Sequence, residues 1–326
     1  MKAILATRSG GPEVLTEVDA PEPMPGPSEV RVRIASIGVN YADVMCRKAV
    51  HRSMRPPPIV LGCEAAGVVD ACGPKSSRLQ PGERVGVYSP FGGAYAQALV
   101  VPEAYALPIP PQMSFETAAA FTHVYLTAYE ALHLGGTPAP EMTVLVTAAA
   151  GGLGGAIVDV ATLLGLRVVA AVGSPAKRER LQQRGVATVV DYAGHDLTAA
   201  VLEITGQRGV DIAIDTVGGA VFAQAQNCLT PLGRIVIAGA ASGDEPRPDV
   251  DALLSRSAVL STLNLSVVFA HRPEHMHEVW GRLIAWYGAG SLGPRIGHRF
   301  ALSRAADAHR LLESRASTDK ILLDPA

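Results

Sequence analysis

An apolar strand that runs directly into a glycine-rich turn is the feature of this chain that most limits its fold. Val144–Val146 is continuously apolar, and the turn follows without a break as Thr147-Ala148-Ala149-Ala150-Gly151-Gly152-Leu153-Gly154. Glycine has no Cβ and so permits tight turns and close backbone approach, and the small and apolar residues after Gly152 are typical of a helix. A buried strand, a tight turn and a helix in this order predict the opening unit of a doubly wound α/β domain.

The segments that follow repeat this alternation of strand and helix. The six strand candidates are Thr143–Thr147, Arg167–Val172, Thr188–Val190, Val210–Thr216, Arg234–Ala238 and Val259–Leu265. Helices are expected to fill the gaps, beginning near Gly152, Ala176, Leu197, Ala220 and Val250. Nearly continuous apolar strands joined by crossover helices form parallel sheets that are buried on both faces. Residues 122–265 are therefore predicted to form a Rossmann domain.

The chain on either side of this domain has a different pattern. Residues 1–121 contain short β-type runs, such as Val30–Ala35 and Gly67–Ala71, separated by proline and glycine turns. Residues 266–326 contain helix candidates around His275–Tyr287 and Ser303–Ser314 and a final strand at Lys320–Leu323. We expect a mostly β domain onto which this tail can pack back.

The glycine-rich turn has the properties of a dinucleotide site. Gly151 and Gly152 let a diphosphate approach the backbone, and Gly154 lets the helix pack tightly on the strand. The helix N-terminus supplies free N–H groups and a positive dipole end. Ala148 occupies a place where the dinucleotide fingerprint usually has glycine. The alternative is a tight turn with a structural role only, which the six-strand context disfavours.

The end of the second strand indicates which nicotinamide cofactor binds. NAD sites usually have Asp or Glu at this place to bind the ribose hydroxyls, but Gly173-Ser174 contains no acid. Lys177 and Arg178 follow and can pair with a 2′-phosphate. The sequence therefore predicts NADPH. The alternative is that both basic residues only occupy an exposed helix face.

Composition and charge exclude several other classes of protein. The net charge is −2 and the basic residues are scattered, so nucleic acid is not expected as a partner. No apolar run approaches the roughly 20 residues of a membrane span, and Met1–Arg8 lacks the pattern of a leader. The chain has four cysteines without the spacing or density of a disulfide scaffold: Cys46, Cys63, Cys72 and Cys228. These observations predict a cytoplasmic protein that does not enter the membrane.

Short motifs follow one another across nearly the whole chain. They are Gly10-Gly11-Pro12-Glu13-Val14-Leu15, Gly38-Val39-Asn40-Tyr41-Ala42-Asp43, Gly62-Cys63-Glu64-Ala65-Ala66-Gly67, Gly92-Gly93-Ala94-Tyr95-Ala96, Leu126-Thr127-Ala128-Tyr129, Ala149-Ala150-Gly151-Gly152-Leu153-Gly154 and Asp215-Thr216-Val217-Gly218-Gly219. Their order and spacing resemble the zinc-independent quinone oxidoreductase branch of the medium-chain dehydrogenase/reductase superfamily. The resemblance implies a GroES-like, mostly β catalytic domain made of residues 1–121 and 266–326, interrupted by the Rossmann domain. It also implies a homodimer, with the sheet edge at Val259–Leu265 as the candidate interface.

The same resemblance implies the residues of the site. Asn40 and Thr127 are expected near the nicotinamide and its ribose. Lys320 is similar to a tail lysine that reaches the cofactor, although Asp319 stands where relatives often have glycine. Ser174, Lys177 and Tyr192 are expected near the adenosine phosphate. Further cofactor contacts are expected at Ala150, Gly151, Gly152, Leu153, Gly154, Gly173, Val217 and Gly239.

The zinc ligands of the related alcohol dehydrogenases are not retained here. In those enzymes a Cys occupies the position of Asn40 and a His that of Cys63. A catalytic zinc needs about three protein ligands, and Cys63 with Glu64 is only a fragment of such a set. A rescue by Cys46 or His51 is the alternative. Three histidines are expected at a solvated helix N-terminus rather than on a metal: His271, His275 and His277.

Without zinc, the expected chemistry is hydride transfer from NADPH to a quinone or an α,β-unsaturated carbonyl. Reduction of an enone also requires a proton, and Tyr41, His51 and solvent are the candidate donors. His51 stands where the family often has a tyrosine. The alternative is a surface histidine whose basic neighbours lower its pKa.

Asp43 is expected to brace the Asn40 turn rather than to transfer protons. The segment Cys46–Pro58 is expected to form part of the substrate wall. Two rival functions stay open, a zinc-dependent alcohol dehydrogenase and a non-catalytic NADPH-binding protein of the same fold.

Overall fold

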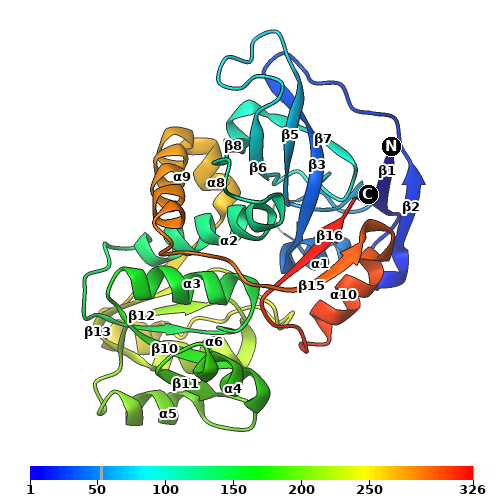
Figure 1. The fold of residues 1–326 in the computed structure, drawn as a ribbon. Helices are drawn as coiled ribbons and strands as arrows, with labels where there is room; N and C mark the ends of the chain where they lie inside the picture. Colours follow the sequence, from blue (N-terminus) through cyan, green and yellow to red (C-terminus); the bar gives the residue numbers. More distant parts are fainter. Residues whose placement is uncertain (52–53, 326) are drawn as a thin grey trace. The chain divides into compact units, whose positions relative to one another are not determined.

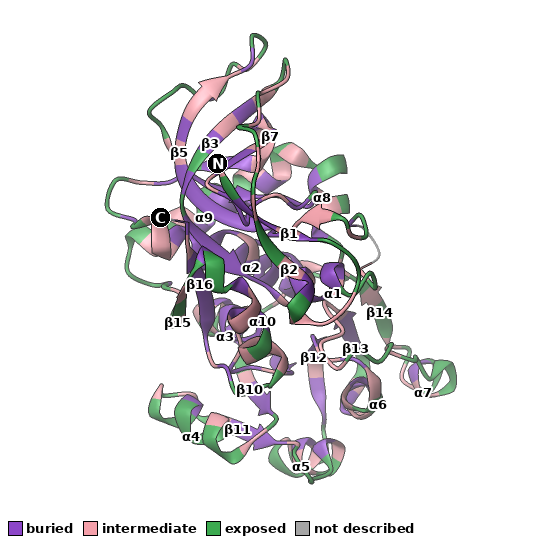
Figure 2. Cartoon of the chain, turned by 90° about the vertical axis from the view of Figure 1, so that its right-hand side faces the viewer, coloured by how far each residue is buried: buried purple, intermediate pink, exposed green. Residues whose placement is uncertain are grey.

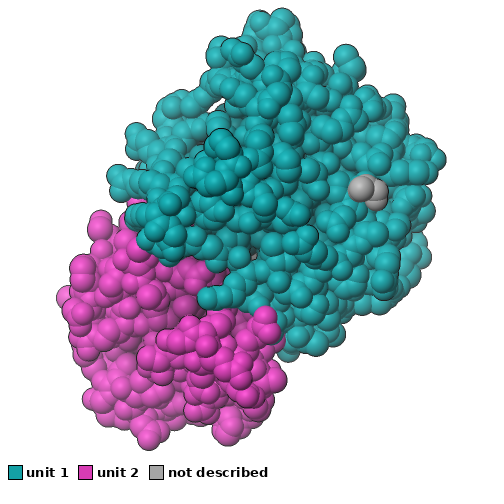
Figure 3. All heavy atoms as spheres, in the orientation of Figure 1, with its two compact units in different colours: residues 1–124, 266–326 teal, residues 125–265 magenta. Residues whose placement is uncertain are grey.

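The computed structural model describes residues 1–51 and 54–325, which form two compact units (Figures 1 and 3). Unit 1 comprises Met1–Val124 and Ser266–Ala326, and unit 2 comprises Tyr125–Leu265. The first division falls inside the long helix α2 (Phe115–His133), slightly later than the expected boundary between residues 121 and 122. A boundary inside a continuous helix gives no turn residue in the sequence to mark it.

Unit 2 contains a six-stranded sheet in which every pair of neighbouring strands is parallel, in the order β11-β10-β9-β12-β13-β14. The strands are β9 (Thr143–Val146), β10 (Arg167–Val172), β11 (Thr188–Asp191), β12 (Val210–Asp215), β13 (Leu229–Ile237) and β14 (Val259–Thr262). The first strand of the sheet, β9, lies beside the fourth, β12. The direction in which strands are added reverses between them, and doubly wound folds bind their ligands at this point. The predicted Rossmann fold is confirmed.

The helices of unit 2 begin within one residue of the predicted positions. They are α3 (Gly152–Leu163), α4 (Pro175–Gln183), α5 (Leu197–Ile204), α6 (Gly219–Asn227) and α7 (Val250–Ser255). Leu145, Val201 and Phe222 belong to one buried cluster, in which helices pack on the sheet. Burial of such side chains contributes roughly 1.5–3 kcal/mol each. The periodic apolar pattern was therefore a sufficient signal for these elements.

Two predicted strand boundaries in unit 2 are wrong. The fifth strand begins at Leu229 rather than at Arg234, and its first residues pair irregularly with β12. The sixth strand ends at Thr262 rather than at Leu265, where helix α8 (Leu265–His271) begins. A short apolar run by itself does not distinguish a strand from the start of a buried helix.

Unit 1 contains a seven-stranded sheet in the order β15-β16-β3-β5-β6-β8, with β7 also paired to β3. The strands are β3 (Glu29–Val39), β5 (Glu64–Cys72), β6 (Arg84–Tyr88), β7 (Ala98–Pro102), β8 (Ala106–Pro108), β15 (Ile296–Ala301) and β16 (Lys320–Asp324). A smaller sheet contains β1 (Lys2–Ala6), β2 (Leu15–Asp19) and β4 (Ile59–Val60). Much of β3 and β5 is buried (Figure 2).

The C-terminal tail belongs to the sheet of unit 1. Strand β16, red in Figure 1, pairs antiparallel with β3, drawn in blue, with Ile321 opposite Val39. The expected return of the tail onto the N-terminal part is therefore confirmed. The helices of this unit are α1 (Tyr41–Arg47), the first part of α2, α8, α9 (Pro273–Gly288) and α10 (Ala305–Glu313), with 3-10 turns η1 (Pro12–Val14), η2 (Glu103–Tyr105) and η3 (Leu302–Arg304). None of the helices in the described ranges combines the length and apolarity needed to cross a membrane.

Candidate functional site

The glycine-rich turn of unit 2 joins β9 to α3. Gly151 is the N-cap residue of α3, and no side chain caps this helix end. The amide of Gly155 donates to the Gly151 carbonyl at 2.8 Å, which makes it the first amide bonded inside the helix. The amides of the three preceding residues have no carbonyl one turn earlier to bind. They form a set of donors at the positive end of the helix dipole.

The space around this turn fits a diphosphate. A Cβ on Gly154 would overlap the carbonyl oxygen of Ala148, so only glycine permits this close packing of helix on strand. A Cβ on Gly151 would meet only the same oxygen, at an ordinary 3.4 Å. Packing within the protein therefore does not require glycine at position 151. An open backbone beside unbonded amides is the arrangement that binds phosphate groups at helix N-termini.

The ends of β10 and β11 bring four of the predicted residues together. Tyr192 packs over Gly173, where an added Cβ would lie 3.2 Å from its ring. Ser174 is the N-cap of α4, and its hydroxyl accepts a hydrogen bond from the amide of Lys177 at 3.4 Å. The first turn of α4 contains no acidic residue. The ring of Tyr192 and the hydroxyl of Ser174 thus lie at the acid-free end of β10, where an NAD site would have a carboxylate, and Lys177 follows in the first turn of α4.

The turn after β12 is tied to the turn after β9. Buried Asp215 accepts hydrogen bonds from the Thr147 hydroxyl at 2.9 Å and from the Val217 amide at 3.3 Å, and burial raises its pKa. The amide of Thr216 in turn donates to the Thr147 hydroxyl at 2.9 Å. A Cβ on Gly239 would lie 2.9 Å from the Thr216 carbonyl oxygen. Val217 and Gly239 therefore lie at the same carboxyl edge of the sheet as the glycine-rich turn.

The predicted cofactor residues are divided between the two units. Thr127, buried on α2, belongs to unit 2 together with the glycine-rich turn and the residues after β10, β11, β12 and β13. Asn40 and Lys320 belong to unit 1.

Asn40 and Lys320 form a buried cluster with Glu64. The Lys320 ammonium donates to Asn40 Oδ1 and to Glu64 Oε2, each at 2.6 Å, and Asn40 Nδ2 donates to the same carboxylate oxygen at 2.9 Å. All three residues are buried. The register of β16 on β3 brings Lys320 to Asn40, and Asp319 before it has the left-handed φ of 59° that glycine adopts without strain. Sequence reasoning missed the role of Glu64, for which the only signal is an acid in an apolar strand.

Asp43 holds the backbone around this cluster. Its carboxylate accepts the amide of Asn40 at 2.9 Å, in the capping box of α1, and the amide of Cys63 at 3.1 Å. Burial raises the pKa of Asp43 to about 6, against the effects of the Asn40 amide and the Lys320 charge. The prediction that Asp43 braces the Asn40 turn is confirmed.

Cys63 and His123 are neutral neighbours of the cluster. Cys63 Sγ lies 3.6 Å from His123 Nδ1, and the imidazole stacks on Tyr88 with ring centroids 5.0 Å apart. Burial raises the pKa of the Cys63 thiol well above its usual value and lowers that of His123 to about 3. The His123 amide donates to Glu64 Oε1 at 2.7 Å. In the described part of the chain, no group of three or more His, Cys, Asp or Glu side chains is arranged to hold a metal ion.

The two candidate proton donors other than solvent are both half-buried. Tyr41 begins α1, and His51 Nδ1 accepts a hydrogen bond from the Met54 amide at 3.0 Å. Burial lowers the pKa of His51. The expected substrate wall, Cys46–Pro58, includes residues 52 and 53, which lie outside the described residues.

The three histidines considered as ligands lie in α8 and α9. His271 ends α8, and His275 and His277 lie in the first turns of α9. The expected solvation is wrong for His277, because its Nε2 is buried and burial lowers its pKa.

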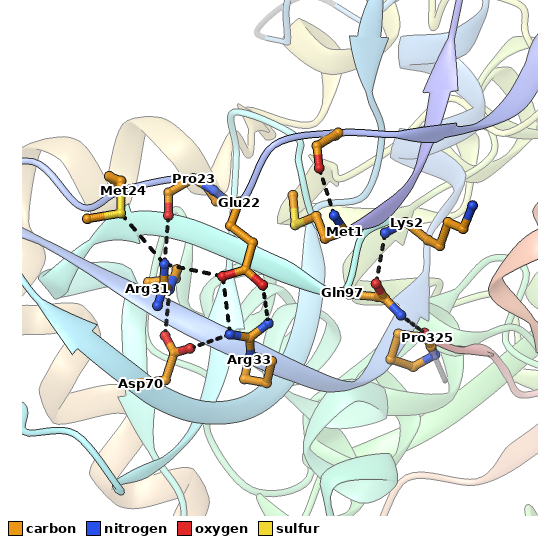
Figure 4. A network of polar contacts seen from close by, with 11 residues as sticks. Met1, Lys2, Glu22, Pro23, Met24, Arg31, Arg33, Asp70, Gln97 and Pro325 are labelled. Atoms are coloured by element: carbon orange, nitrogen blue, oxygen red, sulfur yellow. Dashed lines mark hydrogen bonds and ion pairs between the residues drawn. The ribbon is translucent and has the colours of Figure 1, made fainter.

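A second polar cluster lies on the strands of unit 1 (Figure 4). Arg31 and Arg33 of β3 bind Asp70 of β5 at 2.8 and 2.9 Å, and Arg33 also binds Glu22 at 2.9 Å. Arg33 and Glu22 are each about half exposed. Exposed ion pairs of this kind contribute little to stability. We find no buried catalytic group among the residues of this cluster.

Comparison with known proteins agrees with this architecture. A family model described as "Alcohol dehydrogenase GroES-like domain" matches residues 26–111, and one described as "Zinc-binding dehydrogenase" matches residues 152–285. The chain is 32% identical to the quinone oxidoreductase of Pseudomonas aeruginosa over 324 residues, which cover 99% of each protein.

Two solved structures extend this similarity. An Escherichia coli quinone oxidoreductase complexed with NADPH has a TM-score of 0.93 at 30% identity, with 100% of both chains covered. A 2-haloacrylate reductase has a TM-score of 0.86 at 31% identity, covering 100% of this chain and 99% of the other.

The similarity therefore includes both units and nearly every residue. Asn40 and Cys63 lie outside the match to the zinc-binding dehydrogenase model, so its description does not bear on ligands at those positions. From the fold, the arrangement of the site and these relatives together, the chain belongs to the quinone oxidoreductase-like branch of the medium-chain dehydrogenase/reductase superfamily, whose members combine a GroES-like domain with a Rossmann domain.

Proposed function

We propose that this protein is an NADPH-dependent reductase that transfers hydride to a quinone or an α,β-unsaturated carbonyl without zinc. The observation that carries the proposal is the acid-free end of β10, where Tyr192 packs on Gly173 and Ser174 caps the helix that carries Lys177. The NADPH bound to the Escherichia coli relative and the unsaturated substrate named for the 2-haloacrylate reductase support it.

In this proposal, residues of unit 2 hold the cofactor. The amides at Gly152 and Leu153 bind the diphosphate, and Ser174, Lys177 and Tyr192 bind the 2′-phosphate. When NADPH is bound, its nicotinamide supplies the hydride. Contacts at Ala150, Gly151, Gly154, Gly173, Val217 and Gly239 complete the binding surface along the sheet edge.

In this proposal, Asn40 and Lys320 of unit 1 supply polar groups for the reacting end of the cofactor. Lys320 has three ammonium hydrogens, and two of them bond Asn40 and Glu64. We assign the third ammonium hydrogen to a hydrogen bond with the cofactor. A cation held by a buried carboxylate and an amide is fixed in place, and a fixed charge stabilises developing negative charge without reorganisation.

The metal-free part of the proposal depends on Asn40. Its amide oxygen accepts from Lys320, and its amide nitrogen donates to Glu64. A lysine ammonium bonded to this residue is incompatible with a zinc ion at the same position, because both carry positive charge.

Cofactor preference is tested by measuring dissociation constants for NADPH and NADH. We expect tighter binding of NADPH, and the Lys177→Ala variant should reduce the preference by about 10-fold, the size of one charge-assisted contact. Arg180→Ala is the matched control, since Arg180 is exposed in the last turn of α4 and is not assigned to the phosphate. Equal dissociation constants in the unmutated protein would contradict the proposal.

The reaction itself is tested by following NADPH oxidation with a panel of quinones and enones, before and after dialysis against a chelator. We expect turnover that survives dialysis. Turnover that is lost and then restored by zinc supports the zinc-dependent alcohol dehydrogenase instead. Tight NADPH binding with no turnover on any member of the panel supports a non-catalytic protein.

The proposal includes a homodimer in the cytoplasm that takes a small-molecule substrate. Strand β14 forms one edge of its sheet and exposes two apolar side chains, Val259 and Leu260, on that edge. An apolar strand at a sheet edge is a template for pairing with another chain. The four cysteines are free thiols, which suits a reducing compartment.

A further inference from the structure

A continuous chain of buried polar side chains connects α10 to the start of α1. Arg47, His309, Tyr95 and Asp43 each have an exposed fraction of 0%. Arg47 NH1 lies 3.0 Å from His309 Nδ1, His309 Nε2 lies 3.0 Å from the Tyr95 hydroxyl, and this hydroxyl lies 3.1 Å from Asp43 Oδ2. At its outer end, Arg47 also donates to Glu313 at 2.8 Å.

The chemistry of these groups fixes the direction of every hydrogen bond in the chain. A guanidinium only donates, so His309 Nδ1 must accept from Arg47. The imidazole is then neutral with its hydrogen on Nε2, which donates to the oxygen of Tyr95. Burial and the charge of Arg47 lower the pKa of His309 to about 3, in agreement with a neutral ring. The hydroxyl hydrogen of Tyr95 is left for the Asp43 carboxylate.

The inner end of this series of hydrogen bonds is the Asp43 carboxylate, which positions Asn40. Asp43 also accepts the amides of Asn40 and Cys63, so its two oxygens receive three hydrogen bonds. The ring of Tyr95 occupies the space that a Cβ on Gly62 would need, which fixes the aromatic ring. The Asn40 side chain, held in this way, bonds Lys320.

We propose that His309 is a positioning residue for the reaction, acting through Tyr95 and Asp43 to hold the Asn40 turn. This inference rests on the proposed function, because Asn40 and Lys320 serve the reacting end in it. No group in this series of hydrogen bonds needs to transfer a proton. The series presents a hydrogen-bond donor to Asp43, so that the carboxylate stays ionised and keeps its hydrogen bonds to both backbone amides.

The arrangement makes the turn sensitive to pH. All three neighbours of the Asp43 carboxylate donate to it, so a protonated carboxyl must lose one of these bonds. The titratable or charged groups that face it are Lys320, Tyr95, Cys63 and Cys46. The thiols and the phenol are neutral near neutral pH, because burial raises the pKa of each. Asp43 is therefore the group of this set that titrates near pH 6, and activity is expected above its pKa and lost as the pH falls through it.

The test compares three variants by the pH profile of kcat for NADPH oxidation. Tyr95→Phe removes one hydroxyl and leaves the ring against Gly62. His309→Leu removes both contacts of the imidazole, whereas His309→Gln keeps an acceptor for Arg47 and a donor for Tyr95. On the acidic side of the profile, kcat falls as Asp43 becomes protonated; we call this part the acid limb. We expect Tyr95→Phe and His309→Leu to shift the acid limb to higher pH by about one unit and to lower kcat at neutral pH by about 10-fold. His309→Gln should keep the limb of the unmutated protein.

A matched control is available in unit 2. The buried Tyr125 hydroxyl also donates to an aspartate, Asp159 Oδ2 at 2.7 Å, and both residues belong to the other unit. Tyr125→Phe should leave the acid limb in place. Thermal unfolding of each variant at neutral pH identifies any that fail to fold. Tyr95→Phe, which removes a single atom, keeps the test available if His309→Leu does not fold.

A measurement independent of turnover separates this inference from the proposed function. The carbon-13 shift of the Asp43 carboxyl, assigned with Asp43→Asn, gives its pKa directly. An unchanged Asp43 titration in folded Tyr95→Phe, or an acid limb in His309→Gln that matches His309→Leu, overturns the inference. The Asp43 titration can move in Tyr95→Phe even though the unmutated protein fails to oxidise NADPH with any quinone or enone of the panel. In that case the proposed function fails, while the coupling between Asp43 and Tyr95 is still supported.

Discussion

Two residues beside the candidate site, Ala148 and Asp319, share an unusual backbone conformation. Their φ values are 48° and 59°, in the left-handed region. Aspartate tolerates this region better than most residues, whereas alanine has no polar side chain to compensate. Both residues also lie directly beside the candidate site, before the glycine-rich turn and before Lys320. The local geometry of the site is thus retained here at a cost in conformational energy.

Replacing Ala148 with glycine should stabilise the protein. The left-handed conformation costs a non-glycine residue about 1–2 kcal/mol. Glycine has greater freedom in the unfolded chain, and this reduces the stabilisation gained by the substitution by about 0.4–1 kcal/mol. We expect Ala148→Gly to raise the free energy of unfolding by about 0.5–1 kcal/mol, measured by urea denaturation. Ala149→Gly is the control, because Ala149 is buried and has no positive φ. That control should lower the same quantity, and a loss of stability in both variants would contradict the interpretation.

The role of His51 is decided by a His51→Phe variant assayed with saturating NADPH. A general acid at this position predicts a fall in kcat of about 10²-fold or more, with cofactor affinity kept. Because burial lowers the pKa of His51, its contribution as an acid should grow as the pH falls. This is opposite in sign to the effect expected of Asp43. An unchanged kcat and pH profile would leave solvent or Tyr41 as the donor, and Tyr41→Phe distinguishes these two.

At the scale of elements, the 3-10 turn η2 anchors a long connection of unit 1. The buried carboxylate of Glu103 accepts the amides of Ser77, Arg78 and Leu79 at 3.1, 2.7 and 2.8 Å. These three residues belong to the connection between β5 and β6, which has no regular structure of its own. The Glu103 side chain therefore accepts the backbone hydrogen bonds of this segment, as a neighbouring strand does elsewhere in the sheet.

Glu103→Gln should weaken this anchor. The amide has one acceptor oxygen instead of two and turns its NH₂ group toward backbone donors, and an unsatisfied buried donor costs about 1–3 kcal/mol. We expect a decrease of that size in the free energy of unfolding. Glu83→Gln is the control, since exposed Glu83 makes a single 3.2 Å bond to the Gln80 amide. A change of less than about 0.5 kcal/mol is expected for it, and equal effects of the two substitutions would contradict the role of Glu103.

The elements differ in how well the sequence predicts them, for physical reasons. Strand β10 lies inside the sheet of unit 2 and is a continuous apolar run after Arg167, so its bounds were predicted correctly. Strand β15 was missed, because its sequence includes Gly297, His298 and Arg299 and its side chains are only partly buried. Helix α8 was missed because its first apolar residues continue the pattern of the preceding strand.

The candidate site was predictable only where it follows a local motif. The glycine-rich turn and the Asp43 capping box depend on residues a few positions apart. The partners of Lys320 do not, because Glu64 lies 256 residues away and meets it only through the pairing of β16 with β3 and of β3 with β5. His123 and His309 enter the site region through tertiary packing, and no spacing in the sequence marks either.

At the scale of the whole molecule, the two sheets differ at their edges. The sheet of unit 2 ends at β14, where Val259 and Leu260 are 42% and 36% exposed. At its other end, β11, the sheet has buried side chains at Val189 and Val190, and α4 and α5 contact that strand. The apolar edge is thus the more favourable place for a second copy of the chain to pair.

A charge at this edge should prevent assembly. We expect Leu260→Arg to convert a dimer into a monomer in analytical ultracentrifugation, because an arginine in a closely packed strand pair cannot be solvated. Ile204→Arg, on the exposed surface of α5, is the control and should leave the mass unchanged. A monomer in the unmutated protein, or a dimer in Leu260→Arg, would contradict the proposed interface.

The pairing of β16 with β3 also sets an order of events during synthesis. Unit 2 is one uninterrupted stretch, so all of its residues have left the ribosome before the last strand of unit 1 is made. Domains fold as units while the chain is still growing. Until β16 is made, Ile37–Val39 of β3 has no strand on the side that β16 later takes, and the lysine that completes the Asn40–Glu64 cluster arrives with that strand. A nascent chain cut short before Lys320 therefore carries a finished nucleotide-binding unit and an unfinished catalytic one, and it cannot assemble this cluster.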